Sequence, residues 1–237
     1  VKRRWYRTFP SYYLGIIVFA ISYYLAGSDI PDIWPLYLIF MQYSFESGLH
    51  FFGTSWSLAV EEVFYVVFPL GVFLIWYFWR KPAGAFLTTL ICIIVFSFLT
   101  RCLAMQDFYH WDDEIRRLTF LRLDAIAFGA LIGIFYKNVS RAFFILASIC
   151  MVTTISYLIM NWNDIINTLN NVIILQLIFI FLPLSCAVFV QYCANNLKLK
   201  GNKMITFIAD ISYPLYVFHV PIAYMMFPDG SVATPTK

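Results

Sequence analysis

Ionisable side chains interrupt three long apolar stretches of this sequence, around residues 61, 122 and 219. A charged group at membrane depth costs a few kcal/mol on insertion scales, so each one is a functional candidate that should have a partner. Carboxylic acids and imidazoles can exchange protons, and guanidinium groups can bind anions. The residue types therefore indicate proton transfer together with binding of hydroxyl or phosphate groups.

The first stretch places Ser57, Glu61 and Tyr65 at four-residue steps, directly after Trp56. On a helix this spacing puts the three side chains on one face, whereas Glu62 points about 100° away. A partly desolvated carboxyl group at Glu61 could exchange protons or hold a sugar hydroxyl. An interhelical hydrogen bond or ion pair is an equally good interpretation of the same residue.

The second stretch contains Arg122 and Asp124, followed by Gly129 and Gly133. Residues two apart do not face each other on a helix, so each needs a partner elsewhere, and Arg122 could meet Glu61 across the bundle. The glycine pair forms a small-xxx-small step that allows close helix packing. Structural packing is the favoured interpretation of this stretch.

The third stretch brings Ser212, Tyr216 and His219 onto one helical face, with Tyr213 beside them. Prolines within the same stretch remove backbone donors and bend a helix, which is tolerated where the freed carbonyls face protein or a wet cavity. His219 could carry a proton or donate to a bound group. A single intramembrane histidine more often has a packing role, so packing is the favoured interpretation.

Arginines at other positions have simpler explanations. Arg4 and Arg7 precede a helix expected from Pro10, and they suit phosphate binding but also serve as ordinary topology signals. Arg101 lies near one end of its apolar stretch, where a long side chain can reach the interface, so it is set aside.

The composition requires lipid as the solvent. Apolar residue types make up 62% of the 237 residues and charged types only 12%, against roughly a quarter charged in a soluble domain. This excludes a soluble enzyme, a disordered tail and a nucleic-acid binder. The cysteines form no C-x-x-C pair, so neither a metal site nor a disulfide framework is expected. The chain begins with Val1, which suggests a fragment of a longer chain.

We expect an all-α polytopic bundle that forms a single integral-membrane domain over residues 1–237. A spanning helix needs about 20 apolar residues, and seven stretches qualify: 10–26, 56–79, 84–105, 120–136, 142–160, 172–194 and 204–227. An eighth stretch, 33–45, is too short and is expected to form an interfacial or re-entrant helix. A short tilted span over 33–45 is the alternative.

Basic residues orient the bundle because Lys and Arg accumulate on the cytoplasmic side. If 33–45 does not cross, every purely basic connection falls on one side, which makes residue 1 cytoplasmic in a plasma (inner) membrane. The mixed loop 106–119, which includes His110 and Asp112, would then lie outside. It could bind a polar acceptor, although a solvated loop with local ion pairs is favoured.

Four segments in this order resemble the membrane-bound acyltransferase 3 family. Residues 56–65 resemble its W-S-L-x-V-E-x-x-[FY]-[YF] helix, 122–129 its R-L-D-x-x-x-x-G helix, and 211–221 its I-S-Y-x-L-Y-x-x-H-x-P segment. Arg4 and Arg7 before Pro10 are similar to an R-x-x-R that precedes the family's third helix. The family's first two helices and its last helix are not matched, and the histidine thought to be catalytic belongs to the first helix.

The resemblance implies transfer of an acyl group, with acetyl favoured, from cytoplasmic acyl-CoA to a hydroxyl of an extracytoplasmic carbohydrate or glycolipid. Glu61 and Tyr65 would be catalytic, and Arg4 and Arg7 would contact the donor. Acceptor binding or proton passage would involve the remaining candidates: Trp56, Ser57, Arg122, Asp124, Tyr213 and His219. The acyl-CoA is a co-substrate, no bound cofactor or metal is implied, and membrane lipid surrounds the protein.

Two other functions fit the same residues. A transporter or flippase for a sugar or lipid-linked sugar would also use proline-interrupted helices and intramembrane charge, although the sequence has no inverted repeat. A structural or regulatory remnant without catalysis is the third possibility, because the expected histidine is not matched.

Overall fold

A computed structural model describes residues 2–25, 30–44, 51–107, 115–136, 138–161, 172–196 and 203–226. The described residues are helical or irregular and contain no strand, which confirms the all-α prediction. The chain divides into two compact units. The first comprises Val1–Gln42, Leu49–Trp56 and Leu199–Lys237, and the second comprises Tyr43–Gly48 and Ser57–Lys198.

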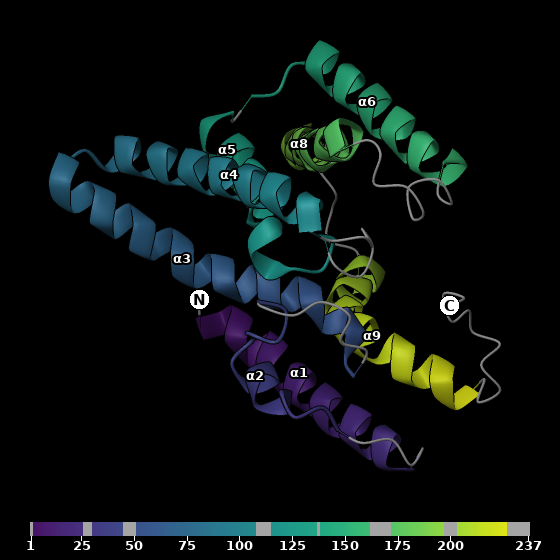
Figure 1. Ribbon diagram of the computed structural model, residues 1–237. Coiled ribbons are helices and arrows are strands. Elements are labelled where there is room, and N and C mark those ends of the chain that lie inside the picture. The colour runs from purple at the N-terminus through teal and green to yellow at the C-terminus, as the bar shows by residue number, and fades with distance from the viewer. Residues whose placement is uncertain are drawn as a thin grey trace. The chain divides into compact units, whose positions relative to one another are not determined.

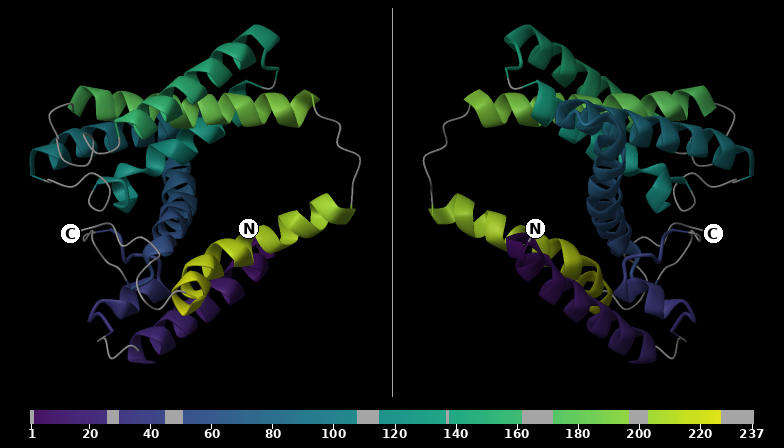
Figure 2. Two further views of the ribbon diagram at one scale, coloured as in Figure 1. Left: turned by 90° about the vertical axis from the view of Figure 1, so that its right-hand side faces the viewer. Right: turned by 90° about the vertical axis from the view of Figure 1, so that its left-hand side faces the viewer.

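The first unit pairs helices from opposite ends of the sequence. Helix α1 (Lys2–Leu25) packs along α9 (Lys203–Met226), with the short α2 (Trp34–Leu38) and the 3-10 turn η1 (Gly53–Ser55) beside them. Figure 2 shows α1 and α9 side by side in both views. The close approach requires glycine, because a Cβ atom on Gly15 would lie 2.8 Å from Val217 Cγ1.

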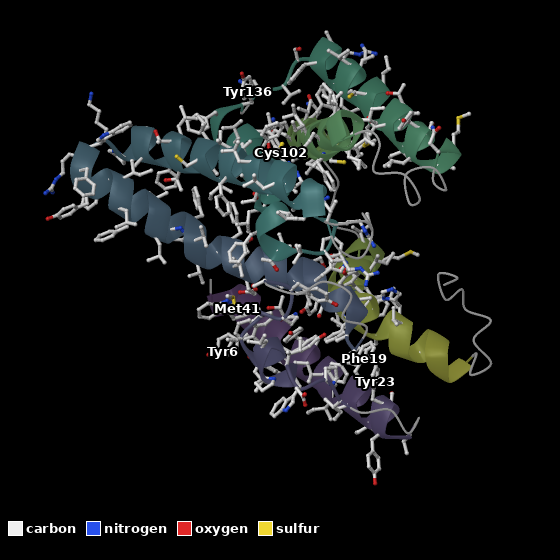
Figure 3. The ribbon with its side chains drawn as sticks, viewed as in Figure 1. Tyr6, Phe19, Tyr23, Met41, Cys102 and Tyr136 are labelled. Atoms are coloured by element: carbon white, nitrogen blue, oxygen red, sulfur yellow. The ribbon has the colours of Figure 1, made fainter. Side chains whose placement is uncertain are left out.

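Polar and aromatic contacts connect residues 37–42 and 51–55 to one another and to α1. The Tyr12 hydroxyl donates to the Tyr37 carbonyl at 2.7 Å, and the Gln42 amide donates to Ser55 Oγ at 3.1 Å. Phe19 and Tyr23 lie one turn apart on α1 (Figure 3). Both rings contact the ring of Phe51. Irregular backbone at membrane depth is tolerated only where protein covers it, and these contacts provide such cover.

Stretch 33–45 is expected as a short interfacial or re-entrant helix. In its described residues, 33–44, the helix is the five-residue α2, which begins after Pro31 and includes Pro35. Five residues rise about 8 Å, so α2 is far too short to cross a bilayer. Phe40 closes the segment in the left-handed region, at φ 61°. The tilted-span alternative is wrong.

The second unit is a bundle of long helices (Figure 1). It contains α3 (Trp56–Trp79), α4 (Pro82–Asp107), η3 (Thr119–Leu121), α5 (Leu123–Phe135), α6 (Arg141–Met160) and α8 (Val172–Asn196). Helix α5 packs between α4 and α8, and α6 packs on α8. Helix α3 ends where Arg80 adopts φ 54°, and the amide of Arg80 donates to the Trp76 carbonyl at 2.8 Å.

Five helices of the described chain are long and apolar enough to cross a membrane: Thr8–Leu25, Gly53–Trp79, Pro82–Ala104, Arg141–Met160 and Ile173–Asn196. In the apolar parts of these helices, only 6% to 33% of the residues are buried inside the protein. Most of their surface therefore suits contact with lipid. The protein is a multi-pass membrane protein. The predicted number of seven spans stays a prediction.

The predicted span over 120–136 is shorter than expected. The structure replaces its first residues with η3, and α5 itself has 13 residues, which is a length of about 20 Å. The bilayer core is about 30 Å thick. The N-terminus of α5 therefore begins inside the bundle, where Arg122 and Asp124 are enclosed by neighbouring helices.

Candidate functional site

Arg101 is the most completely buried charged residue of the described chain, with no exposed surface. Its Nη2 atom lies 2.6 Å from Oδ2 of Asp124, which is 1% exposed. The expectation that Arg101 reaches the membrane interface is wrong. Arg101 lies nearly two turns before the end of α4. Its guanidinium group faces the start of α5, where the Asp124 carboxyl group is its partner.

Further hydrogen bonds hold the Arg101 guanidinium in place. Nη1 donates to the carbonyl of Leu121, the last residue of the 3-10 turn η3, and Nε donates to Gln176 Oε1 at 3.0 Å. The Gln176 amide in turn donates to Cys102 Sγ at 3.4 Å, and Figure 3 labels Cys102 on α4. One guanidinium thus connects α4, α5 and α8.

Arg122 lies beside this cluster without joining the ion pair. Its guanidinium carbon is 4.6 Å from the centre of the Phe179 ring, and that of Arg101 is 4.9 Å from the same centre. The buried Nε of Arg122 and the buried Oδ1 of Asp124 form no hydrogen bond. The guanidinium groups of Arg101 and Arg122 therefore lie near the single carboxylate of Asp124. These three residues, taken as one cluster, carry a net positive charge. Pairing between Arg122 and Glu61 stays a prediction.

Helix α3 presents the predicted acidic face. Ser57, Glu61 and Tyr65 follow the four-residue step within a continuous helix, so they share a face. Glu61 is half-buried and Tyr65 is 46% exposed. Glu62 is also half-buried but is rotated about 100° from Glu61. The two glutamates are the only charged residues in the 24-residue helix.

On α9, the ring of His219 is fixed by its own helix. Its Nδ1 lies 2.6 Å from the Tyr216 carbonyl oxygen. Because a carbonyl oxygen can only accept, this contact is a hydrogen bond in the tautomer that has its proton on Nδ1 and its lone pair on Nε2. The Tyr216 hydroxyl donates to the Thr54 carbonyl at 2.8 Å, which ties α9 to η1. His219 is exposed and Tyr213 is half-buried.

The N-terminal arginines lie in the first two turns of α1, and their side chains lie outside the described residues. Neighbouring aromatic side chains are described: the Trp5 and Phe9 rings stack at 5.5 Å between centres. Together with Tyr6, Pro10 and Tyr13 they line an apolar cavity of about 530 Å³.

The predicted acceptor loop cannot be placed in the site, because 108–114, including His110 and Asp112, lie outside the described residues. In the part of the chain that the structure describes, no three His, Cys, Asp or Glu side chains gather as a metal site would require.

The remaining candidates belong to two different units. Arg4, Arg7, Trp56, Tyr213 and His219 are in the first unit, and Ser57, Glu61, Tyr65, Arg122 and Asp124 are in the second. Within the second unit the structure joins Asp124 to Arg101, a residue that sequence reasoning missed. The available signal was Asp124 itself, since a carboxylate in an apolar stretch needs a cation and Arg101 is in the preceding helix.

Comparison with known proteins gives one family. The family model Acyl_transf_3, described as an acyltransferase domain, matches residues 1–233. No curated protein and no solved structure matches the chain.

Proposed function

Because the chain belongs to the Acyl_transf_3 family of acyltransferases, we propose that it is an O-acyltransferase embedded in the inner membrane. It transfers an acyl group, with acetyl favoured, from cytoplasmic acyl-CoA to a hydroxyl of an extracytoplasmic carbohydrate or glycolipid. The first residue of the chain lies on the cytoplasmic side. A transporter or flippase is not favoured, since the family match covers nearly the whole chain.

The reaction needs a base near the acceptor. The hydroxyl oxygen attacks the carbonyl carbon of the thioester, a new C–O bond forms, and the C–S bond breaks to release CoA. The base accepts the hydroxyl proton, and the leaving thiolate is finally protonated. Positioned general acid–base groups contribute typically about 10²–10⁴-fold to such reactions.

The observation that carries the proposal is the pair of glutamates in α3, half-buried in an otherwise uncharged helix of span length. We assign proton transfer to Glu61, because it shares its face with the hydroxyl groups of Ser57 and Tyr65. A carboxylate, a phenol and an alcohol one turn apart can together hold and deprotonate a sugar hydroxyl. Trp56 at the start of the helix suits stacking against a sugar ring.

Glu61→Gln tests this assignment, and Glu62→Gln is the matched control. Both glutamates are half-buried neighbours, so their substitutions remove the same charge at nearly the same depth. We expect Glu61→Gln to lower acylation of surface carbohydrate at least 100-fold at equal membrane abundance, and Glu62→Gln to change it less than threefold. Normal acylation by Glu61→Gln, or equal losses in both variants, would refute the role of Glu61.

Donor binding is assigned to Arg4 and Arg7, whose guanidinium groups suit bidentate contact with the phosphates of CoA. Replacing both with Ala should weaken acetyl-CoA binding at least tenfold by calorimetry. Replacing both with Lys keeps the positive charge that sets topology but removes the planar fork. Unchanged donor affinity in the Ala variant would leave these arginines a topological role only.

A further inference from the structure

An apolar groove of about 490 Å³ lies between α5 and α8 in the second unit. Arg122, the residue that precedes α5, lines the groove on one side, and Gln191 of α8 lines it on the other. Between them the lining includes the small residues Ala125, Gly129 and Ala187. The groove therefore combines a cationic side chain with an uncharged, mostly hydrocarbon body.

The sequence explains why the two helices leave space between them. At Gly129, apart from its chain neighbours and the nearby backbone of α5 itself, no atom lies within 4 Å of the position that a Cβ would occupy. Glycine at a helix contact normally brings the partner closer, but here it borders open volume. Pro183, which removes one backbone donor inside α8, also lines the groove.

The described residues that line the groove include no acidic residue to balance the positive charge of Arg122. The Asp124 carboxylate is already bonded to Arg101, and the buried Nε of Arg122 has no hydrogen-bond partner. A buried donor without a partner is costly, about 1–3 kcal/mol and more for a charged group. An anionic ligand in the groove, beside Arg122, would balance the net positive charge of Arg101, Arg122 and Asp124.

We propose that the groove binds a lipid with an anionic phosphate headgroup, which pairs with Arg122 while a hydrocarbon chain lies along Ala125, Gly129 and Ala187. A free phosphate ion would leave the apolar body of the groove empty, and an uncharged hydrocarbon would leave Arg122 unsatisfied. An amphiphile satisfies both, and a protein surrounded by lipid meets such molecules continuously. The proposal does not depend on the acyltransferase function.

Native mass spectrometry of the full chain in detergent tests the proposal with added phosphatidylglycerol or phosphatidylcholine of identical chains. We expect phosphatidylglycerol to bind at least tenfold more tightly. Arg122→Gln should abolish this preference, while Arg141→Gln should keep it, since Arg141 is exposed at the start of α6. An equal preference in Arg122→Gln and in the unmodified protein would overturn the proposal.

A larger side chain at Gly129 tests whether a hydrocarbon chain occupies the groove. Gly129→Leu should extend into the open volume and weaken phosphatidylglycerol binding at least fivefold, whereas Gly129→Ala should change it less than twofold. Thermal unfolding in detergent checks that both variants are folded. Unchanged binding in a folded Gly129→Leu variant would show that no chain lies there, and displacement of the lipid by millimolar inorganic phosphate would assign the site to a free anion. Because no acyl donor is present, these outcomes are separate from any loss of transferase activity.

Discussion

The guanidinium of Arg101 and the carboxylate of Asp124 meet at 2.6 Å with almost no exposed surface. Burying two charges is expensive, and the attraction between them repays the expense only with good geometry and further hydrogen bonds. Arg101 meets that condition through Leu121 and Gln176, whereas Asp124 keeps one oxygen without a hydrogen bond. The pair organises the junction of α4, α5 and α8, and the second carboxylate oxygen stays buried without a donor.

Breaking this pair should destabilise the second unit. Asp124→Ala leaves the Arg101 charge buried without its counter-ion, and the expected loss is about 3–5 kcal/mol. Asp124→Ala combined with Arg101→Met should regain a large part of that loss, because no uncompensated charge remains. Unfolding in detergent, followed by circular dichroism, measures both. Equal stability of the single variant and the unmodified protein would contradict a structural role for the pair.

If His219 transfers protons during acylation, its contribution to activity should require the basic Nε2 atom. In His219→Asn, the side-chain amide can still donate to the Tyr216 carbonyl, but the basic nitrogen is lost. We expect acylation to fall at least tenfold at unchanged membrane abundance. Tyr216→Phe, which removes only the hydroxyl bound to Thr54, serves as the comparison and should instead lower thermal stability. Full activity of His219→Asn would assign the histidine to packing.

Gly15 should tolerate no side chain. A Cβ at this position would lie 2.8 Å from Val217 Cγ1 and 3.1 Å from Phe52 Cζ, and overpacking typically costs about 1–3 kcal/mol. Gly15→Ala should therefore destabilise the first unit by roughly that amount, and adding Val217→Ala should restore most of it. Gly84→Ala is the control, since its nearest neighbour would be 3.8 Å away. Thermal unfolding of the four proteins checks the order.

Ser140 should stabilise the start of α6. Its Oγ accepts a hydrogen bond from the Phe143 amide at 3.2 Å, and loss of such a cap costs about 0.5–2 kcal/mol. We expect Ser140→Ala to lower stability by that amount, while Ser140→Asp, which keeps an acceptor, should not. Hydrogen exchange of the first-turn amides of α6 measures the local effect, and identical exchange in both variants would contradict the cap.

The long apolar helices could be predicted closely from the sequence. The predicted bounds 56–79 agree with α3, and 142–160 differs from α6 by a single residue. Lipid imposes a strong rule, because every backbone group must be satisfied within the helix over about 20 residues. Charged or proline-containing ends then fix where each apolar run stops. The sequence pattern alone is sufficient for such elements.

The short and irregular parts of the site could not be predicted in the same way. Arg101 bonds to Asp124, which is 23 residues away in the sequence, and to Gln176, which is 75 residues away. No local sequence pattern distinguishes a buried arginine from one that reaches the interface. The 3-10 turn before α5 depends on tertiary contacts too, since the Thr119 amide donates to the carbonyl of Tyr43. The acceptor of the Tyr216 hydroxyl, a backbone carbonyl at Thr54, has no sequence signature.

The packing of α1 on α9 also constrains how the protein is made. At synthesis rates of about 5–20 residues per second, the ribosome needs roughly 10–40 s to travel from Gly15 to Val217. During that time the face of α1 around Gly15 has no α9 to pack against. The contact between α1 and α9 can therefore form only after synthesis has reached Val217, which makes it a late step in the folding of the first unit.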